Sequence, residues 1–230
     1  MLNLEILIKD FWGVLTVVPQ TFALAVTIFI LSVLAGTIMA LIQEYKIPVL
    51  SQIVWLFKLF MRGTPLIVFI LIMYYSLPMI VGFFASLFGI DFNSYGMSPV
   101  VILIVAVTLT LSSFQAETIR GSFLSVAYGQ VEAARSMGYN SFQAFRRVIF
   151  PQALVEAIPE LGSAFLIIMK AISLGYMITV VDIFAQARLM AASNSYYIEA
   201  FFVAALMYWV IAYLITYLAN KYEAILLSRS

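Results

Sequence analysis

The sequence predicts an all-α integral membrane protein with about five transmembrane helices and one long polar loop between the third and the fourth. Hydrophobic residues make up 64% of the 230 residues and charged residues only 10%, against about 25% charged residues in soluble domains. A mean hydropathy of +1.08 is too high for one soluble core, so lipid must be the solvent for much of the surface. Neither an internal repeat nor a low-complexity linker is evident, and we expect residues 1–230 to form a single membrane domain.

The five predicted spans are apolar stretches of the length that a bilayer requires, about 20 residues each. They cover approximately residues 17–42, 53–88, 97–116, 153–181 and 200–220. The second is interrupted by Arg62-Gly63-Thr64-Pro65. Glycine and proline are tolerated at membrane depth where the freed backbone groups find partners or line a cavity. Thr64 is therefore a candidate cavity residue, and a simple kink near the membrane interface is the alternative.

Lysine and arginine in the short loops predict the orientation, because they gather on the cytoplasmic side. With five alternating spans, Lys9 and Arg188 fall on one side. The other side holds the larger set: Lys46, Lys58, Arg62, Arg120, Arg135, Arg146, Arg147, Lys221 and Arg229. We therefore expect the N-terminus outside and the C-terminus in the cytoplasm.

The polar loop at residues 117–147 is expected to form two short helices on the cytoplasmic side. Residues 130–137 suit the first helix, and Gly138 suits its left-handed C-terminal cap. Asn140 suits the N-cap of the second helix, and Gln143 three residues later completes a capping box.

Three groups of residues in this loop stand at a characteristic spacing. They are Glu132-Ala133-Ala134, then Gly138, then Val148-Ile149-Phe150-Pro151. This resembles the signature of the permease subunits of bacterial ABC importers, which is Glu-Ala-Ala, three residues, Gly, nine residues and Ile-x-Leu-Pro. The complete spacing, placed before a span, is much more specific than the tripeptide alone.

Other stretches are similar to the polar amino-acid subfamily of these permeases. They are Arg62-Gly63-Thr64-Pro65-Leu66 with Tyr74-Tyr75, residues 116–121, and Gly129-Gln130. Where the subfamily has Lys-Asp-Thr-Ser-Leu in its fourth span, this chain has Lys170-Ala171-Ile172-Ser173-Leu174, which lacks the Asp and the Thr. Val181-Asp182-Ile183 is loosely similar to the cystine-importing branch.

The segment of about 128–149 is accordingly the predicted coupling segment to an ATPase. Alanines and glycine give a helix of low relief that can enter a groove on a partner. The predicted contacts are Glu132, Ala133, Ala134, Arg135, Gly138 and Phe142. The chain contains no Gly-x-x-x-x-Gly-Lys-Ser/Thr phosphate loop, so ATP must be bound elsewhere. The alternative is a solvated loop with a chance Glu-Ala-Ala.

The resemblance implies the type I ABC importer permease fold and a non-catalytic subunit of an ATP-driven amino-acid importer in a bacterial cytoplasmic membrane. L-cystine is one candidate substrate. Glutamine, histidine or a basic amino acid is the alternative. The implied partners are two ATPase subunits that bind ATP and magnesium, a second permease subunit (identical or homologous), an extracytoplasmic solute-binding protein, and lipid. No cofactor or metal is expected in this chain, and a net charge of +1 argues against nucleic acid.

Ionisable groups inside a span are costly and usually functional. Lys170 lies near the middle of the fourth predicted span, and we expect it to face a polar cavity with Ser173 and to attract a substrate carboxylate. An ion pair with Glu117 is the alternative for Lys170. Glu117 itself either receives a substrate ammonium group or braces Arg120, three residues away. Glu160, at the start of the fourth span, is interpreted as part of a solvated end or a gate contact.

Two other classes of function compete with an importer. A secondary transporter or channel driven by an ion gradient would use Lys170 and Glu117 as coupling residues and would need no ATPase. A membrane-embedded enzyme would have few catalytic groups available, because the chain has no histidine and no cysteine and no Gly-x-Ser-x-Gly nucleophile motif.

Overall fold

The computed structural model describes residues 3–93 and 96–227, and every regular element in that part of the chain is helical. The helices are α1 (Leu4–Leu15), α2 (Val18–Glu44), α3 (Leu50–Gly63), α4 (Leu66–Leu87), α5 (Pro99–Leu124), α6 (Tyr128–Ser136), α7 (Ser141–Ala144), the π-helical turn η2 (Phe145–Ile149), α8 (Phe150–Ile172), the 3₁₀ segment η3 (Ser173–Ile178), α9 (Ile183–Asn194) and α10 (Tyr197–Leu227).

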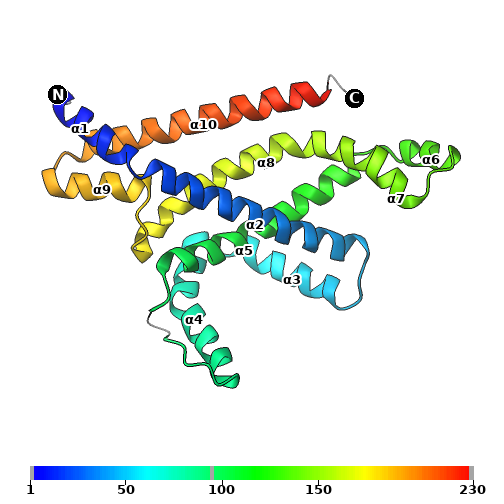
Figure 1. The fold of residues 1–230 in the computed structure, drawn as a ribbon, viewed down its shortest axis with the longest axis horizontal. Helices are drawn as coiled ribbons and strands as arrows, with labels where there is room; N and C mark the ends of the chain where they lie inside the picture. Colours follow the sequence, from blue (N-terminus) through cyan, green and yellow to red (C-terminus); the bar gives the residue numbers. More distant parts are fainter. Residues whose placement is uncertain (1–2, 94–95, 228–230) are drawn as a thin grey trace.

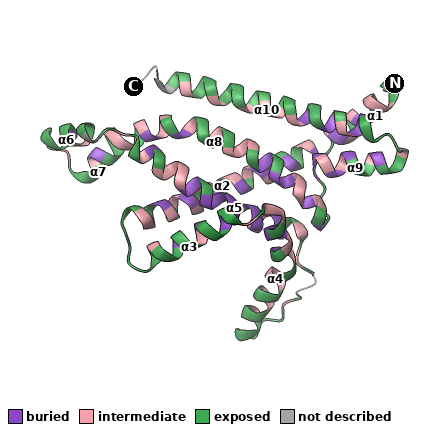
Figure 2. Ribbon diagram, turned by 180° about the vertical axis from the view of Figure 1, so that it is seen from behind, coloured by how far each residue is buried: buried purple, intermediate pink, exposed green. Residues whose placement is uncertain are grey.

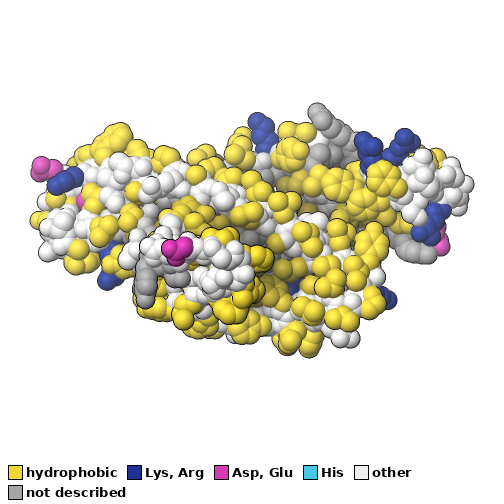
Figure 3. Space-filling view, turned by 60° about the horizontal axis from the view of Figure 1, so that its bottom comes forward, with side chains coloured by type: hydrophobic (Ala, Val, Ile, Leu, Met, Phe, Trp, Pro, Cys, Tyr) yellow, Lys and Arg dark blue, Asp and Glu magenta, His cyan; other side chains and the backbone are white. Residues whose placement is uncertain are grey.

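Within the described residues, 5 helices are long and apolar enough to cross a membrane. They are Val18–Glu44, Leu66–Leu87, Pro99–Leu124, Ser141–Ile178 and Tyr197–Ile225. This confirms the all-α membrane fold with five spans. Hydrophobic side chains cover most of the face shown in Figure 3, as a lipid-exposed surface requires.

The second span begins later than the sequence predicted. We expected it to start near Ile53 and to continue through the interruption, but α3 ends at Gly63 and α4 begins at Leu66. The cause is local, because Pro65 disfavours a helical conformation in the residue before it. Thr64 is accordingly extended, with φ −94° and ψ 128°. The residues of α3 therefore form a separate helix that carries Lys58 and Arg62.

Two short helices were not predicted. In α1 the Asn3 side chain accepts hydrogen bonds from the backbone N–H groups of Glu5 and Ile6. In α9 the Asp182 side chain accepts one from Ala185 N–H. Each helix has 12 residues, which is too short to span a bilayer. They lie together against the N-terminal part of α10, at the left end of Figure 1.

The core is centred on the crossing of α2 and α5, where buried residues concentrate in Figure 2. Gly36 of α2 allows this close approach, because a Cβ there would lie 2.9 Å from the backbone N of Ala116 on α5. By contrast, few residues of α4 are buried, and the C-terminal half of α10 is mostly exposed.

The polar segments lie at opposite ends of the long axis (Figure 1). One end holds α6, α7 and the loop between α2 and α3, and the C-terminal end of α10 points the same way. The other end holds α1 and α9. The two ends of the chain thus lie toward opposite sides of the spans, as five crossings require.

Candidate functional site

The coupling segment forms a compact pair of short helices. Gly138 follows α6 with a left-handed φ of +83°, as predicted. Asn140 is the N-cap of α7 in a reciprocal capping box: its Oδ1 accepts from Gln143 N–H at 2.9 Å, and Asn140 N–H donates to Gln143 Oε1 at 3.0 Å. Both local predictions are confirmed, because glycine and capping signals act within a few residues.

The exposed groups of this segment face away from the bundle. Glu132, Ala133 and Arg135 on α6 are exposed, and the Phe142 side chain on α7 is 69% exposed. Ala134 is only 3% exposed, so any contact with a partner from this stretch comes from its neighbours. Aromatic side chains are enriched at protein interfaces, so the exposed Phe142 is a candidate contact with a partner.

Aromatic contacts tie the coupling segment to two spans. The Phe145 ring packs against Phe123 of α5 at 5.7 Å and against Phe150 of α8 at 6.0 Å, measured between ring centroids. The guanidinium of Arg147 lies 5.5 Å from the centroid of the Tyr139 ring. The residue that follows α7 thus packs against both α5 and α8.

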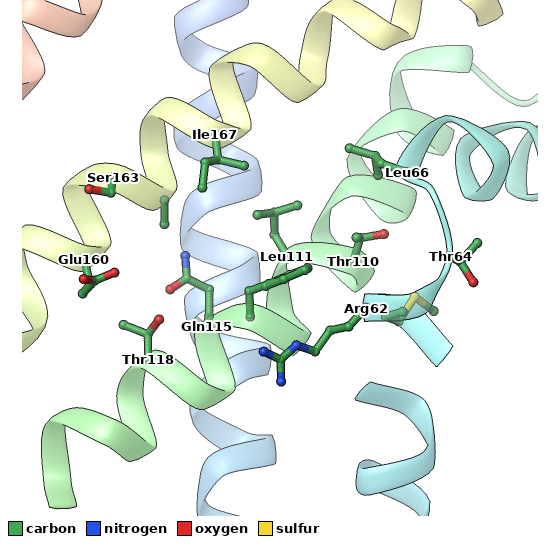
Figure 4. A pocket seen from close by; sticks show the side chains of 13 residues that line it. Arg62, Thr64, Leu66, Thr110, Leu111, Gln115, Thr118, Glu160, Ser163 and Ile167 are labelled. Carbon is green, nitrogen blue, oxygen red and sulfur yellow. The ribbon is translucent and has the colours of Figure 1, made fainter. Parts of the chain in front are cut away.

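A cavity of about 360 Å³ lies where α3 gives way to α4, and α5 and α8 form its other walls. Figure 4 shows its lining side chains. They are Met61, Arg62, Thr64, Leu66, Thr110, Leu111, Phe114, Gln115, Thr118, Glu160, Ser163, Ala164 and Ile167. The lining is mostly apolar with a few polar groups, which is the usual composition of a small-molecule site.

Two side chains of opposite charge line the cavity. Arg62, at the end of α3, lies over the Phe114 ring at 5.4 Å from the centroid. Its Nη1 is 3.9 Å from Glu117 Oε1. Glu160 comes from α8, on the other side of Gln115 in Figure 4.

An ion pair between a buried lysine and a partly exposed glutamate lies next to the cavity. Lys58 of α3 is 5% exposed, and its ammonium donates to Glu117 Oε1 on α5 at 2.5 Å and to Gln43 Oε1 on α2. Arg120 Nε lies 3.8 Å from Glu44 Oε2. Among the described residues, Glu117 and Arg120 form no direct ion pair with each other, and each has its oppositely charged partner on another helix.

A comparison with protein families identifies the family of this chain. Residues 32–224 match the model of the binding-protein-dependent transport system inner membrane component family. The chain belongs to this family. It is thus a multi-pass membrane permease, and the matched region contains the coupling segment and the whole cavity lining.

Individual proteins agree with this assignment. The permease is 33% identical over 219 residues to the probable amino-acid permease protein YxeN of Bacillus subtilis (strain 168), covering 95% of this chain and 93% of YxeN. It is 32% identical over 209 residues to the L-cystine transport system permease protein TcyL of the same organism, covering 90% and 85% of the two chains. A crystal structure of an amino acid ABC transporter with histidines matches with a TM-score of 0.81 and 25% identity, covering 97% of this chain and 99% of that chain.

The permease therefore has the type I ABC importer fold that the Glu-Ala-Ala spacing implied, and its relatives are amino-acid ABC transporter permeases.

The permease brings together only some of the residues predicted to bind substrate. Thr64 lines the cavity, with its hydroxyl donating to Phe60 O at 2.8 Å. Glu117 lies behind Arg62, and Lys170 and Ser173 lie outside the lining. Lys170 is exposed near the C-terminal end of α8. The alternative pair of Lys170 with Glu117 is not formed, since Glu117 binds Lys58.

Sequence reasoning missed Gln115 and assigned Glu160 to a solvated end or a gate contact. Gln115 is uncharged, so a search for ionisable groups in the spans passed over it. A detectable signal was present, because Leu111, Gln115 and Thr118 recur at helical spacing along one face of the third span. The spacing does not show which face of α5 meets α8, because that depends on how the helices pack.

Proposed function

We propose that this permease forms the translocation pathway of an ATP-driven importer for a polar amino acid and couples it to cytoplasmic ATPase subunits. One observation carries the proposal: the Glu-Ala-Ala segment forms exposed helices that are fastened to α5 and α8, and these two helices also wall the cavity. The coupling segment and the cavity are thus connected through the same two helices, α5 and α8.

The proposed mechanism is alternating access. Closure of the ATPases on ATP moves α6 and α7 through contacts at Glu132, Ala133, Arg135 and Phe142, with Ala134 and Gly138 maintaining their shape. Phe145 passes the motion to α5 and α8, which changes the side of the membrane on which the pathway opens. ATP shifts the population between the two states because it binds the closed ATPases more tightly. ATP and magnesium belong to the ATPase subunits, and this chain supplies no catalytic group.

The proposed assembly contains two permease subunits, two ATPases and an extracytoplasmic solute-binding protein. The exposed apolar side chains of α4 and α10 are the proposed contacts with lipid and with a second permease. The proposed orientation places α6, α7 and the C-terminus in the cytoplasm and the N-terminus outside. Basic residues at the α6–α7 end support it, in line with the positive-inside rule (Figure 3).

The proposed substrate is a polar amino acid, and L-cystine is the first to test because TcyL is named for its transport. The cavity offers Arg62 and Glu160 to the two charges of a zwitterion. Lys170, Glu117, Thr64 and Ser173 are kept in the proposal as residues that meet the substrate along its path.

Reconstitution tests the proposal. Proteoliposomes would contain the permease, its ATPase and its binding protein, and the uptake of labelled cystine, glutamine, histidine and arginine would be followed. We expect uptake of at least one amino acid with the complete set and ATP, and none when the ATPase is left out. Equal uptake by the permease alone would contradict the proposal.

A further inference from the structure

One buried side chain in the cavity wall has no hydrogen-bond partner. Gln115 is 1% exposed, and neither its Nε2 nor its Oε1 is hydrogen-bonded within the described residues. Figure 4 shows its amide pointing away from α5 toward α8, between Glu160 and Leu111. Buried amides almost always make hydrogen bonds, so this one is available to a ligand.

Two other polar residues nearby on α5, Thr110 and Ser113, bond their own helix. Thr110 Oγ1 donates to Ala106 O at 3.1 Å, and Ser113 Oγ donates to Thr110 O at 2.6 Å. Short hydroxyl side chains can bond the preceding turn of their own helix in this way. Gln115 does not, and it presents one acceptor and two donors to the cavity.

The charges of the cavity are balanced. Arg62 and Glu160 are the only ionisable residues among the described side chains that line it. They match the carboxylate and the ammonium group of one amino acid. A substrate with a further net charge would place that charge unpaired against a mostly apolar wall, which is unfavourable.

We infer that Gln115 is a specificity-determining residue, and that its amide hydrogen-bonds the distal end of a substrate of zero net charge that carries both a donor and an acceptor there. A side-chain carboxamide has this chemistry. So does the second half of cystine, whose carboxylate takes a hydrogen bond from Nε2 while its ammonium donates to Oε1. Arginine and glutamate do not fit. The inference rests on the proposed function and specifies its substrate class.

The test is equilibrium binding of labelled glutamine and cystine to the purified permease–ATPase complex without the binding protein, so that only the permease selects the ligand. We expect competition by unlabelled glutamine or cystine and none by arginine or glutamate. Gln115→Leu removes both hydrogen bonds at similar volume and should weaken binding roughly tenfold or more. The control Gln52→Leu changes an exposed glutamine of α3 outside the cavity and should bind as the unmodified complex does.

A charge substitution gives a readout that a purely structural role would not. Gln115→Glu is nearly isosteric and adds a negative charge, so binding should shift from glutamine toward arginine. If Gln115→Leu does not fold, Gln115→Cys serves instead, because the chain has no other cysteine. A thiol reagent should then label it, and glutamine should protect it. Cystine is left out of this arm because its disulfide would exchange with the introduced thiol.

Three results would overturn the inference: arginine bound as tightly as glutamine and cystine, Gln115 variants with unchanged selectivity, or a complex that binds no amino acid. A different result, from the uptake experiment, would overturn the proposed function. If the reconstituted system shows no ATP-dependent uptake of any amino acid, the importer itself is wrong. If it imports arginine and ignores Gln115→Glu, only the inference fails.

Discussion

At the scale of single residues, the Lys58–Glu117 ion pair explains how a lysine is held in an apolar environment. The ammonium of Lys58 has two oxygen partners, Glu117 and Gln43, and these come from two other helices. Breaking a buried pair by removing one partner costs more than replacing both, because the remaining charge stays buried. The pair therefore joins α2, α3 and α5 only while all its members are present.

Removing Glu117 alone should destabilise the folded permease. We expect Glu117→Ala to lower the free energy of unfolding by about 2 kcal/mol, below the 3–5 kcal/mol of a fully buried pair because Glu117 is partly exposed. The double variant Lys58→Met, Glu117→Leu should recover most of the loss. A denaturant titration in detergent measures both. A double variant as unstable as the single one would show that Lys58 is not the cause.

Asp10 on α1 predicts a pH dependence of stability. Burial raises the pKa of the Asp10 carboxyl above its usual value, and Glu199 raises it further, whereas Lys9 and the Asn194 side chain oppose the shift. A carboxyl with a raised pKa adds stability at low pH and loses that contribution as the pH rises through the folded-state pKa. The contribution of Asp10 to stability should therefore fall as the pH rises.

Asp10→Asn keeps the shape and removes the charge. We therefore expect a higher Tm than the unmodified permease at pH 7, and a difference that shrinks as the pH falls toward 4. Thermal unfolding at the two pH values is the measurement. A Tm difference that stayed constant with pH would mean that ionisation of Asp10 has no part in it.

At the scale of helices, the coupling segment presents one large apolar contact. Phe142 is an exposed residue on a helix fixed by its capping box. Phe142→Ala should weaken ATPase binding by about 2 kcal/mol, the usual loss at a central interface aromatic, or roughly thirtyfold in affinity. Affinity between the permease and the ATPase measures this.

The matched control is Phe88→Ala, which changes another highly exposed phenylalanine, at the end of α4. It should leave the affinity for the ATPase unchanged. An equal loss in both variants would assign the effect to general damage and not to coupling.

The sequence predicted best what depends on neighbouring residues. The five apolar stretches correctly predicted the spans. The helix caps of the coupling segment were correctly predicted from Gly138, Asn140 and Gln143. The break at Pro65 was visible but was taken as an interruption within one span. The helices α1 and α9 were missed because 12 residues of mixed polarity resemble a loop. The partners of Lys58 and the exposure of Lys170 depend on how the helices cross, which periodicity does not determine.

At the scale of the whole molecule, the contact of α2 with α5 organises the bundle and holds α5, which contributes one wall of the cavity. Gly36→Ala should lower the free energy of unfolding by about 1–3 kcal/mol, the usual cost of overpacking. The added Cβ would lie 2.7 Å from Gln115 Cβ and 2.9 Å from the backbone of Ala116, which cannot move alone.

Gly13→Ala is the control for this substitution. The Cβ there meets only the end of the flexible Met190 side chain, so we expect little change in stability. Unfolding curves of the two variants in detergent compare them. Equal stabilities would show that α2 and α5 have more freedom to separate than their contact suggests.

The most direct test of the central claim is to measure amino-acid uptake and ATP hydrolysis together in proteoliposomes that contain the permease, its ATPase and its binding protein. The coupling segment predicts accumulation of the amino acid above its outside concentration, only while ATP is hydrolysed, and with no effect of a proton ionophore. Accumulation without ATP that collapses on adding the ionophore would contradict the account and favour a gradient-driven transporter.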